Sequence, residues 1–131
     1  MILTGLAELA QFKTFTNVFL TTFRTFTTAN HFFDMLVERF NLKPKELLTD
    51  HEYMIWKANL RNPVQRLVLD VFRIWLENYR LLEEEPHMAP RLKGFLSHIV
   101  SPPHNQAAAI IIQTIDRLVR WTIRLLDLSG Y

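Results

Sequence analysis

The sequence predicts an all-α, single-domain helical bundle of about five to six helices that begins with a helical hairpin. Apolar residues recur at spacings of three and four in several segments, whereas the alternation typical of strands is absent. Glycine supplies only 3 of the 131 residues while 49% are hydrophobic, which disfavours disorder and turn-rich β architectures. We therefore expect one domain over residues 1–131, with more apolar surface than its own core can bury.

A helical hairpin is expected over residues 15–40. Its first helix carries four rings on one stripe, because the spacings are four, four and three: Phe15, Phe19, Phe23 and Phe26. Thr27 and Thr28 end this helix, and Thr28 is a suitable N-cap for the next. The second helix is amphipathic, with Asp34 and Glu38 toward water and an apolar face made of Phe32, Phe33, Leu36, Val37 and Phe40.

The middle of the chain predicts a connector followed by the central helix. Residues 41–62 are less regular and hold one short helix around Trp56. Asn62 and Pro63 form a favourable cap and first-turn pair, so we expect the central helix to begin there and to cover residues 63–79. Two apolar stripes predict burial on two sides: Val64, Leu67, Val68, Val71, Trp75 and Tyr79 form one, and Leu69, Phe72 and Leu76 form the other.

Two more helices are expected in the last third. The run from Glu83 to Pro86 should be a solvated interruption, after which an amphipathic helix runs from Met88 to Ile99. The prolines at 102 and 103 end it. A long helix follows from about Asn105 to Leu126, with an inner face of Ala108, Ile111, Ile112, Ile115, Leu118, Val119, Thr122 and Leu125.

No residue pattern indicates catalysis, a cofactor or a metal. The glycines at 5, 94 and 130 are isolated, so no phosphate-binding loop is predicted, and the serines at 97, 101 and 129 lie in no nucleophile motif. The histidines fall on separate elements; His98 and His104 flank the double proline, and we expect two surface imidazoles rather than ligands. The chain alone is therefore not expected to be an enzyme.

The net charge and the N-terminal sequence bear on the binding partners and the cellular compartment of the protein. A net charge of +2 is too small for a nucleic-acid footprint, and the absence of cysteine suits a reducing compartment. We see no transmembrane segment and no signal peptide, so we expect a cytoplasmic protein.

One basic face is a candidate protein interface. Arg117, Arg120 and Arg124 are spaced three and four residues apart and share a face of the last helix, with Trp121 among them. The bordering Asp116 and Asp127 favour an ordinary solvated face over lipid or nucleic-acid binding. Tryptophan and arginine together are nevertheless common anchors of protein interfaces.

Two blocks of sequence resemble a known family. Residues 16–28 read TNVFLTTFRTFTT and run on to FFDMLVERF, which is similar to the opening hairpin of the Ras exchanger motif, the RasGEF N-terminal (REM) domain of Ras-family guanine-nucleotide exchange factors. Residues 63–79, PVQRLVLDVFRIWLENY, are similar to its second block. The order of the blocks also matches. The sequence departs from the family pattern at three positions, and these departures are mild. Phe23 stands where the family usually has tyrosine, and Ala29 stands where it commonly has proline. His31 stands where an acidic residue would complete a capping box.

The resemblance implies a non-catalytic, all-α module that packs against the catalytic exchange domain of the same protein and stabilises it. In some members the module also contributes to a second binding surface for a Ras-family GTPase. Membrane recruitment, where it occurs, is expected through other parts of the parent protein. Six residues match apolar positions of the family motif and are expected to lie in the core: Phe19, Phe23, Phe26, Leu36, Trp75 and Leu76.

Arg24 also matches the motif, and we expect it to hydrogen-bond a helix end or a carboxylate, with Asp34 and Glu38 as candidates. Direct contact of Arg24 with a GTPase is the less favoured alternative. A second function remains open for the whole chain, namely a free-standing helical adaptor or dimerisation domain that self-associates through its surplus apolar surface.

Overall fold

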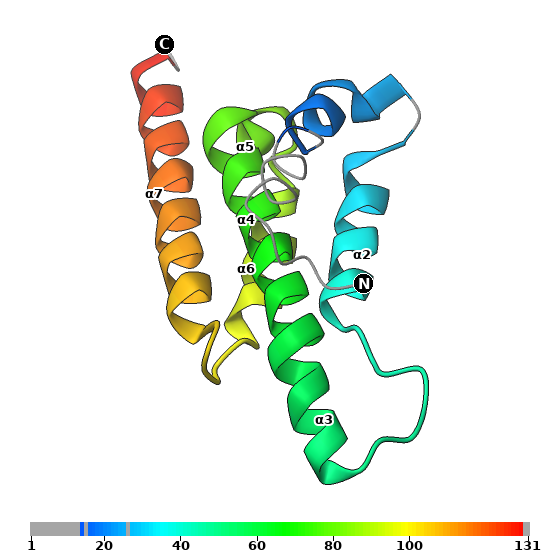
Figure 1. Cartoon of the computed structure of the whole chain (residues 1–131). Coiled ribbons are helices and arrows are strands. Elements are labelled where there is room, and N and C mark those ends of the chain that lie inside the picture. Colours follow the sequence, from blue (N-terminus) through cyan, green and yellow to red (C-terminus); the bar gives the residue numbers. More distant parts are fainter. Residues whose placement is uncertain (1–13, 15, 26, 130–131) are drawn as a thin grey trace. The chain divides into compact units, whose positions relative to one another are not determined.

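The computed structural model describes residues 14, 16–25 and 27–129, and the side chains of these residues as far as Arg124. This part of the chain is mostly helical, contains no strand, and holds the six α-helices labelled α2 to α7 (Figure 1). It divides into two compact units, residues 1–71 and 72–131, which are described separately. The predicted all-α class is confirmed.

The first unit opens with the predicted helical hairpin. Residues 16–22 are helical and tighten into the 3₁₀ turn η1, Phe23–Thr25, before α2, Ala29–Phe40. The N-cap of α2 is Thr28, as predicted, and its hydroxyl accepts a hydrogen bond of 3.1 Å from the backbone N–H of His31. This bond satisfies one of the otherwise unpaired amides of the first helical turn.

Aromatic rings hold the two arms of the hairpin together. The ring of Phe32 on α2 lies 4.6 Å from that of Phe19 and 5.6 Å from that of Phe23, measured between centroids. Phe33 and Phe40 of α2 are also buried, whereas Asp34 and Glu38 are exposed as expected. The predicted rings Phe15 and Phe26 lie outside the described residues.

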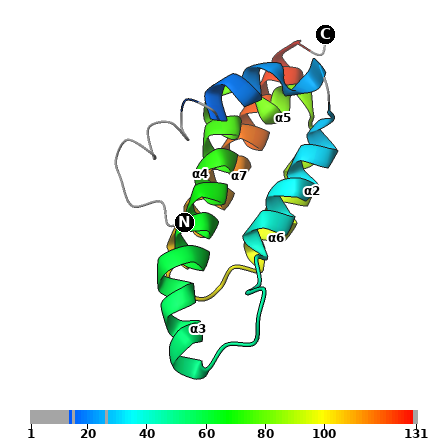
Figure 2. The same ribbon diagram turned by 45° about the vertical axis from the view of Figure 1, so that its right-hand side comes forward.

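Helix α4 begins at Asn62 as predicted, but Asn62 is not the free N-cap that we expected. Helix α3, Asp50–Trp56, continues through a π-helical turn, η2, Lys57–Arg61, directly into α4, Asn62–Asn78 (Figure 2). Asn62 has helical dihedrals, and its N–H bonds to the carbonyl of Lys57, five residues back. Proline lacks an N–H and its ring clashes with the carbonyl four residues earlier, so a regular helix would be broken at Pro63. The wider turn just before Pro63 gives a physical reason why the helix passes through it.

Helix α3 begins at a capping box that the sequence analysis did not identify. The Thr49 hydroxyl accepts from the N–H of Glu52 at 3.2 Å, and the Glu52 carboxylate accepts from the N–H of Thr49 at 3.0 Å. These two bonds satisfy donors at the helix start reciprocally and fix where the 41–49 loop ends. Hydrogen bonds from Thr49 lower the pKa of Glu52, and the bond from the Thr49 backbone has a larger effect than the bond from its hydroxyl.

A side-chain hydrogen bond ties α4 to α2 inside the first unit. Nε2 of Gln65 donates to the backbone carbonyl of Phe40 at 3.0 Å, in a partly buried position. Phe40 is the last residue of α2, where carbonyls have no partner within their own helix. Gln65 therefore caps the end of a helix that lies 25 residues away in sequence.

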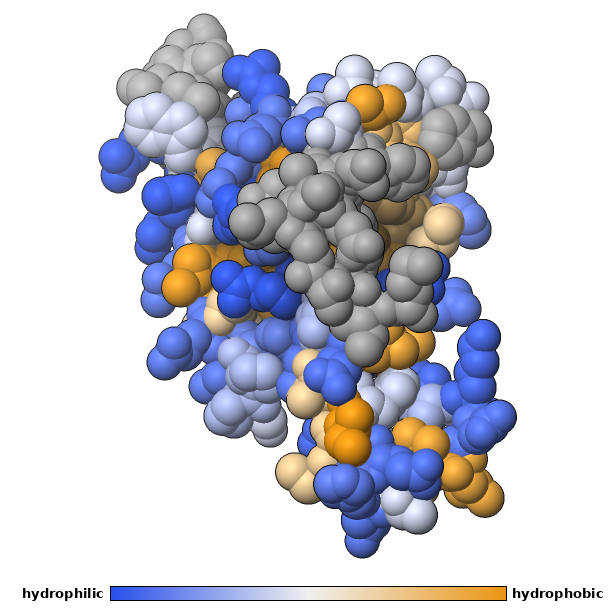
Figure 3. All heavy atoms as spheres, viewed as in Figure 1, coloured by the Kyte–Doolittle hydropathy of each residue, from blue (hydrophilic) through white to orange (hydrophobic). Residues whose placement is uncertain are grey.

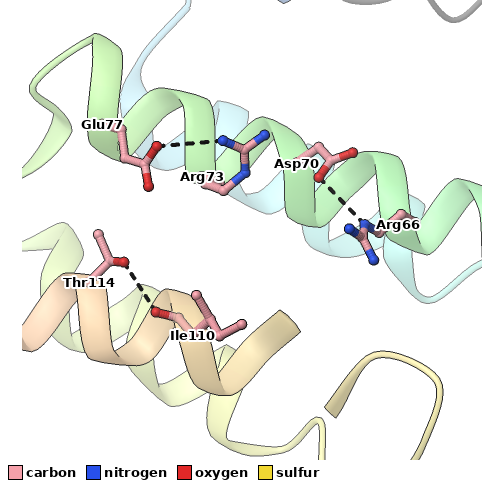
Figure 4. A network of polar contacts seen from close by, with 6 residues as sticks. All are labelled: Arg66, Asp70, Arg73, Glu77, Ile110 and Thr114. Carbon is pink, nitrogen blue, oxygen red and sulfur yellow. Dashed lines mark hydrogen bonds and ion pairs between the residues drawn. The ribbon is translucent and has the colours of Figure 1, made fainter. Parts of the chain in front are cut away.

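Helix α4 buries the predicted stripes in part: Leu69, Phe72 and Leu76 are all buried, whereas Val64, Leu67 and Tyr79 of the other stripe are only partly buried. Six of its apolar residues are buried, and Trp75 is only 1% exposed. The polar side of the helix holds two ion pairs at i,i+4 spacing, Arg66–Asp70 at 3.6 Å and Arg73–Glu77 at 3.5 Å (Figure 4). The buried residues of the two stripes are Val68, Val71 and Trp75, and Leu69, Phe72 and Leu76.

In the second unit, the chain leaves α4 through Arg80, which has a left-handed φ of 54°. The following acidic run is not the loop that we expected, because Glu83 and Glu84 end a short helix, α5, Leu81–Glu84. Leu81 and Leu82 are buried and anchor this helix, while the two glutamates remain exposed. The acidic residues therefore form the outer side of a packed helical turn.

Helices α6 and α7 complete the second unit and lie side by side (Figure 1). Helix α6, Met88–Ser97, buries Met88, Leu92 and Leu96, and ends two residues earlier than predicted. Helix α7, Asn105–Ser129, follows the double proline as expected and buries Ala108, Ile111 and Ile115. None of the described helices is both long and apolar enough to cross a membrane.

Candidate functional site

The candidate interface residues of α7 line one hollow. Arg117, Arg120, Trp121 and Arg124 surround an open depression of about 370 Å³ together with Leu118, and most of its lining is apolar. The spacing places the three arginines and Trp121 within an arc of about 100 degrees of the helix, since successive residues rotate by about that angle. The sequence had predicted this shared face, and the structure brings the four side chains together.

This face points away from the buried side of α7. Ala108, Ile111 and Ile115 are buried and lie on the opposite side of the helix in angular terms, whereas Trp121 is 55% exposed. A tryptophan indole is large and mostly apolar, so leaving half of it in water forgoes a substantial hydrophobic contribution. Exposure of Trp121 between three cations is the kind of surface that protein partners cover.

The electrostatics of the face differ from the sequence expectation at Asp116. We expected this carboxylate to dilute the neighbouring positive charge, but its Oδ1 lies 2.7 Å from Nζ of Lys93 on α6. No described residue forms an ion pair with Arg117, Arg120 or Arg124. The described part of the chain therefore supplies no ion-pair partner for the three guanidinium groups, and the side chain of the bordering Asp127 lies outside it.

The family-motif residues divide between core and surface. Phe23, Trp75 and Leu76 are buried, Phe19 and Leu36 are partly exposed, and Phe26 lies outside the described residues. Arg24 is exposed, and its guanidinium carbon stands 5.1 Å from the ring centroid of Phe23. Its bonding to Asp34 or Glu38 stays a prediction.

One histidine expectation is wrong. His98 is exposed, with Nδ1 at 2.7 Å from the carbonyl of Gly94, but His104 is only 6% exposed and therefore is not a surface imidazole. It lies in the turn that leads into α7, next to the prolines, and the neighbouring sequence gives no sign of its burial. Among the described residues, no group of three His, Asp or Glu side chains could hold a metal ion.

A second surface feature was missed by the sequence reasoning. On α3, none of whose residues is buried, Tyr53, Met54 and Ile55 are exposed, and Leu47 in the preceding loop is fully exposed. Figure 3 shows apolar side chains in orange among hydrophilic ones in the region of α3. The irregular sequence of residues 41–62 shows no apolar stripe that would reveal this feature.

The sequence is similar to known proteins over most of its length. The model of the RasGEF N-terminal motif matches residues 3–95. Cell division control protein 25 of Saccharomyces cerevisiae is 29% identical over 100 residues, which cover 76% of this chain and 6% of that protein. Protein son of sevenless of Drosophila melanogaster is 30% identical over 129 residues, covering 79% of this chain and 8% of that protein.

A third relative, Ras guanine nucleotide exchange factor efc25 of Schizosaccharomyces pombe, is 28% identical over 115 residues, which cover 84% of this chain. The match spans only 11% of that relative's length, so the chain corresponds to a small part of each of these proteins. The family match includes the hairpin and α4, and it ends before the Trp121 face of α7. By this match and by its all-helical structure, the chain belongs to the RasGEF N-terminal motif family.

Proposed function

We propose that the chain is the non-catalytic regulatory and structural module of a Ras-family guanine-nucleotide exchange factor. In this proposal it packs against the catalytic exchange domain of the same protein and stabilises the conformation that is competent for exchange. The observation that carries the proposal is the family match over residues 3–95. A relative named as a Ras guanine nucleotide exchange factor supports the assignment to GTPase signalling.

The burial pattern supports a structural role for the motif. The family blocks contribute core residues, including Phe23, Trp75 and Leu76, so the motif specifies a packed scaffold more than a reactive site. Besides Trp121, nine large apolar side chains of the described residues are exposed, which provides surface for packing against a neighbouring domain. The domain then acts by binding energy alone, without supplying a catalytic group.

Thermal unfolding of a mixture tests this proposal. The separately purified exchange domain of the parent protein should melt at a higher temperature when this chain is added, because a partner that binds only the native state stabilises it. Bovine serum albumin at the same concentration serves as the control for unspecific protein effects. An unchanged melting temperature at saturating concentrations of the chain contradicts the proposal.

The exposed apolar surface also favours a second candidate function, a self-associating helical adaptor. Light scattering separates the two, since an adaptor of this kind forms a tight dimer at low concentration whether or not an exchange domain is present. A monomer that becomes a one-to-one complex with the exchange domain supports the module and excludes the adaptor.

A further inference from the structure

We propose that the α7 face formed by Arg117, Arg120, Trp121 and Arg124 binds an acidic peptide segment in which an apolar side chain is flanked by carboxylates. This binding role goes beyond the module function and does not depend on it, because the face lies outside the residues matched by the family model. The occupant is a segment of a partner protein, recognised by charge and by one apolar anchor.

The shape of the face argues for an apolar anchor. The hollow of about 370 Å³ has mostly apolar walls that include Leu118 and Trp121. A depression of this size accepts one or two side chains, and burying the half-exposed indole of Trp121 provides hydrophobic free energy. An apolar side chain of the partner therefore belongs in the hollow.

The charges around the hollow argue for carboxylates beside that anchor. Arg117 and Arg124 are seven residues apart, so the guanidinium groups are distributed along roughly 10 Å of helix. Guanidinium groups bind carboxylates through two parallel hydrogen bonds, and Asp116 is already engaged by Lys93. Carboxylates placed on both sides of one apolar residue match this distribution.

The same observations disfavour an anionic membrane as the occupant. Three basic residues are fewer than the cluster of about four to eight that is typical of lipid-binding surfaces. A membrane surface is also flat, whereas here the apolar side chains line a depression between the cations. The recessed geometry fits a side chain of a folded or extended peptide better than a layer of headgroups.

The test is a fluorescence titration of the 131-residue chain with a short labelled peptide that carries a Leu-Phe pair flanked on both sides by glutamates. Binding should be saturable and should weaken about tenfold or more in the variant Trp121→Ala, because central aromatic anchors dominate such interfaces. Arg120→Gln should weaken binding by several-fold and reduce its salt dependence. All these positions are exposed, so the variants are expected to fold, and circular dichroism checks this.

Two matched variants control for surface changes elsewhere. Ile123→Ala removes a similarly exposed apolar residue of α7 that does not line the hollow, and Arg73→Gln removes one positive charge on α4. Neither should change the affinity for the peptide by more than about twofold.

Three results would overturn the proposal. The first is no binding above that of a peptide with glutamines in place of the glutamates. The second is equal binding when the Leu-Phe pair is replaced by serines, which would indicate unspecific charge attraction. The third is tight, Trp121-dependent binding to phosphatidylserine vesicles without binding to the peptide, which would assign the face to membranes. Since no exchange domain takes part in these measurements, their failure leaves the module function untouched.

Discussion

Nζ of Lys93 on α6 lies 2.7 Å from Oδ1 of Asp116 on α7, and both side chains are about half exposed. An ion pair in such a position contributes little to stability, because water screens it. Its greater effect is on the neighbouring face, since Asp116 stands four residues before Arg120 and would otherwise be placed to pair with it. Among the described residues, Asp116 pairs with Lys93 and not with Arg120.

Replacing Lys93 should weaken the binding of acidic peptides without unfolding the protein. In Lys93→Met the carboxylate of Asp116 becomes free to pair with Arg120, and we expect an affinity loss of about two- to fivefold, with at most about 1 kcal/mol lost from the free energy of unfolding. Asp116→Asn should leave the affinity unchanged or raise it. Peptide titration and urea unfolding measure both effects, and equal losses of affinity in the two variants would contradict this account.

The capping box of α3 should make the stability of this helix depend on pH. The pKa of Glu52 is lowered in the folded protein by the hydrogen bonds from Thr49, relative to an ordinary value of 4.5. The carboxylate therefore adds its full stabilisation above pH 4.5, and this is lost as the pH falls through the lowered pKa.

Hydrogen exchange of the α3 amides, corrected for the intrinsic rate at each pH, measures this effect. Protection should fall as the pH drops from about 6 to about 3, and Glu52→Gln should abolish the part of this dependence due to the cap. Glu46→Gln, in the preceding loop, is the matched control. The same pH dependence in the wild-type chain and in Glu52→Gln would show that the capping carboxylate is not its source.

Gln65 should contribute more to the stability of the fold than an ordinary polar residue of a helix does. Its side-chain amide donates a hydrogen bond to the carbonyl of Phe40. Gln65→Leu removes this donor and leaves the partly buried carbonyl without that hydrogen bond. We expect a loss of about 1–2 kcal/mol in the free energy of unfolding, measured with urea. Gln106→Leu, at an exposed position of α7, should change stability by no more than about 0.5 kcal/mol. Equal effects of the two substitutions would mean that the capping bond contributes nothing.

The opening hairpin should depend strongly on Phe23. This side chain is 1% exposed, and its ring contacts those of Phe19 and Phe32. Phe23→Ala should cost about 3–5 kcal/mol, because it leaves a cavity in the aromatic cluster. If that variant does not fold, the milder Phe23→Leu still gives a measurable loss. Val18→Ala, at an exposed position on the same helix, should be nearly neutral, and a comparable loss there would contradict the assignment.

Local patterns predicted most of the fold. Thr28 was identifiable as an N-cap from its position between two apolar stripes, and the two stripes of α4 follow from helical periodicity. The join between α3 and α4 was not predictable in this way. Asn62 and Pro63 form a normal helix start in isolation, and only the π-helical turn before them allows the helix to continue.

The candidate site was predictable in part for the same reason. The spacing of Arg117, Arg120 and Arg124 places them on one face, because such positions depend only on the helix repeat. The pairing of Asp116 with Lys93 joins residues that are 23 positions apart, and the burial of His104 depends on tertiary packing. Neither feature has a signal in the local sequence.

The most direct test of the central claim is the rate of nucleotide release from a Ras-family GTPase. If the proposed function is right, the GTPase should release a fluorescent GDP analogue more slowly when the module is deleted from its parent protein, and adding the 131-residue chain back should restore part of the rate. The chain by itself should leave release at its spontaneous rate. An unchanged rate after deletion, with the exchange domain correctly folded, would contradict the assignment of this domain as a stabilising module.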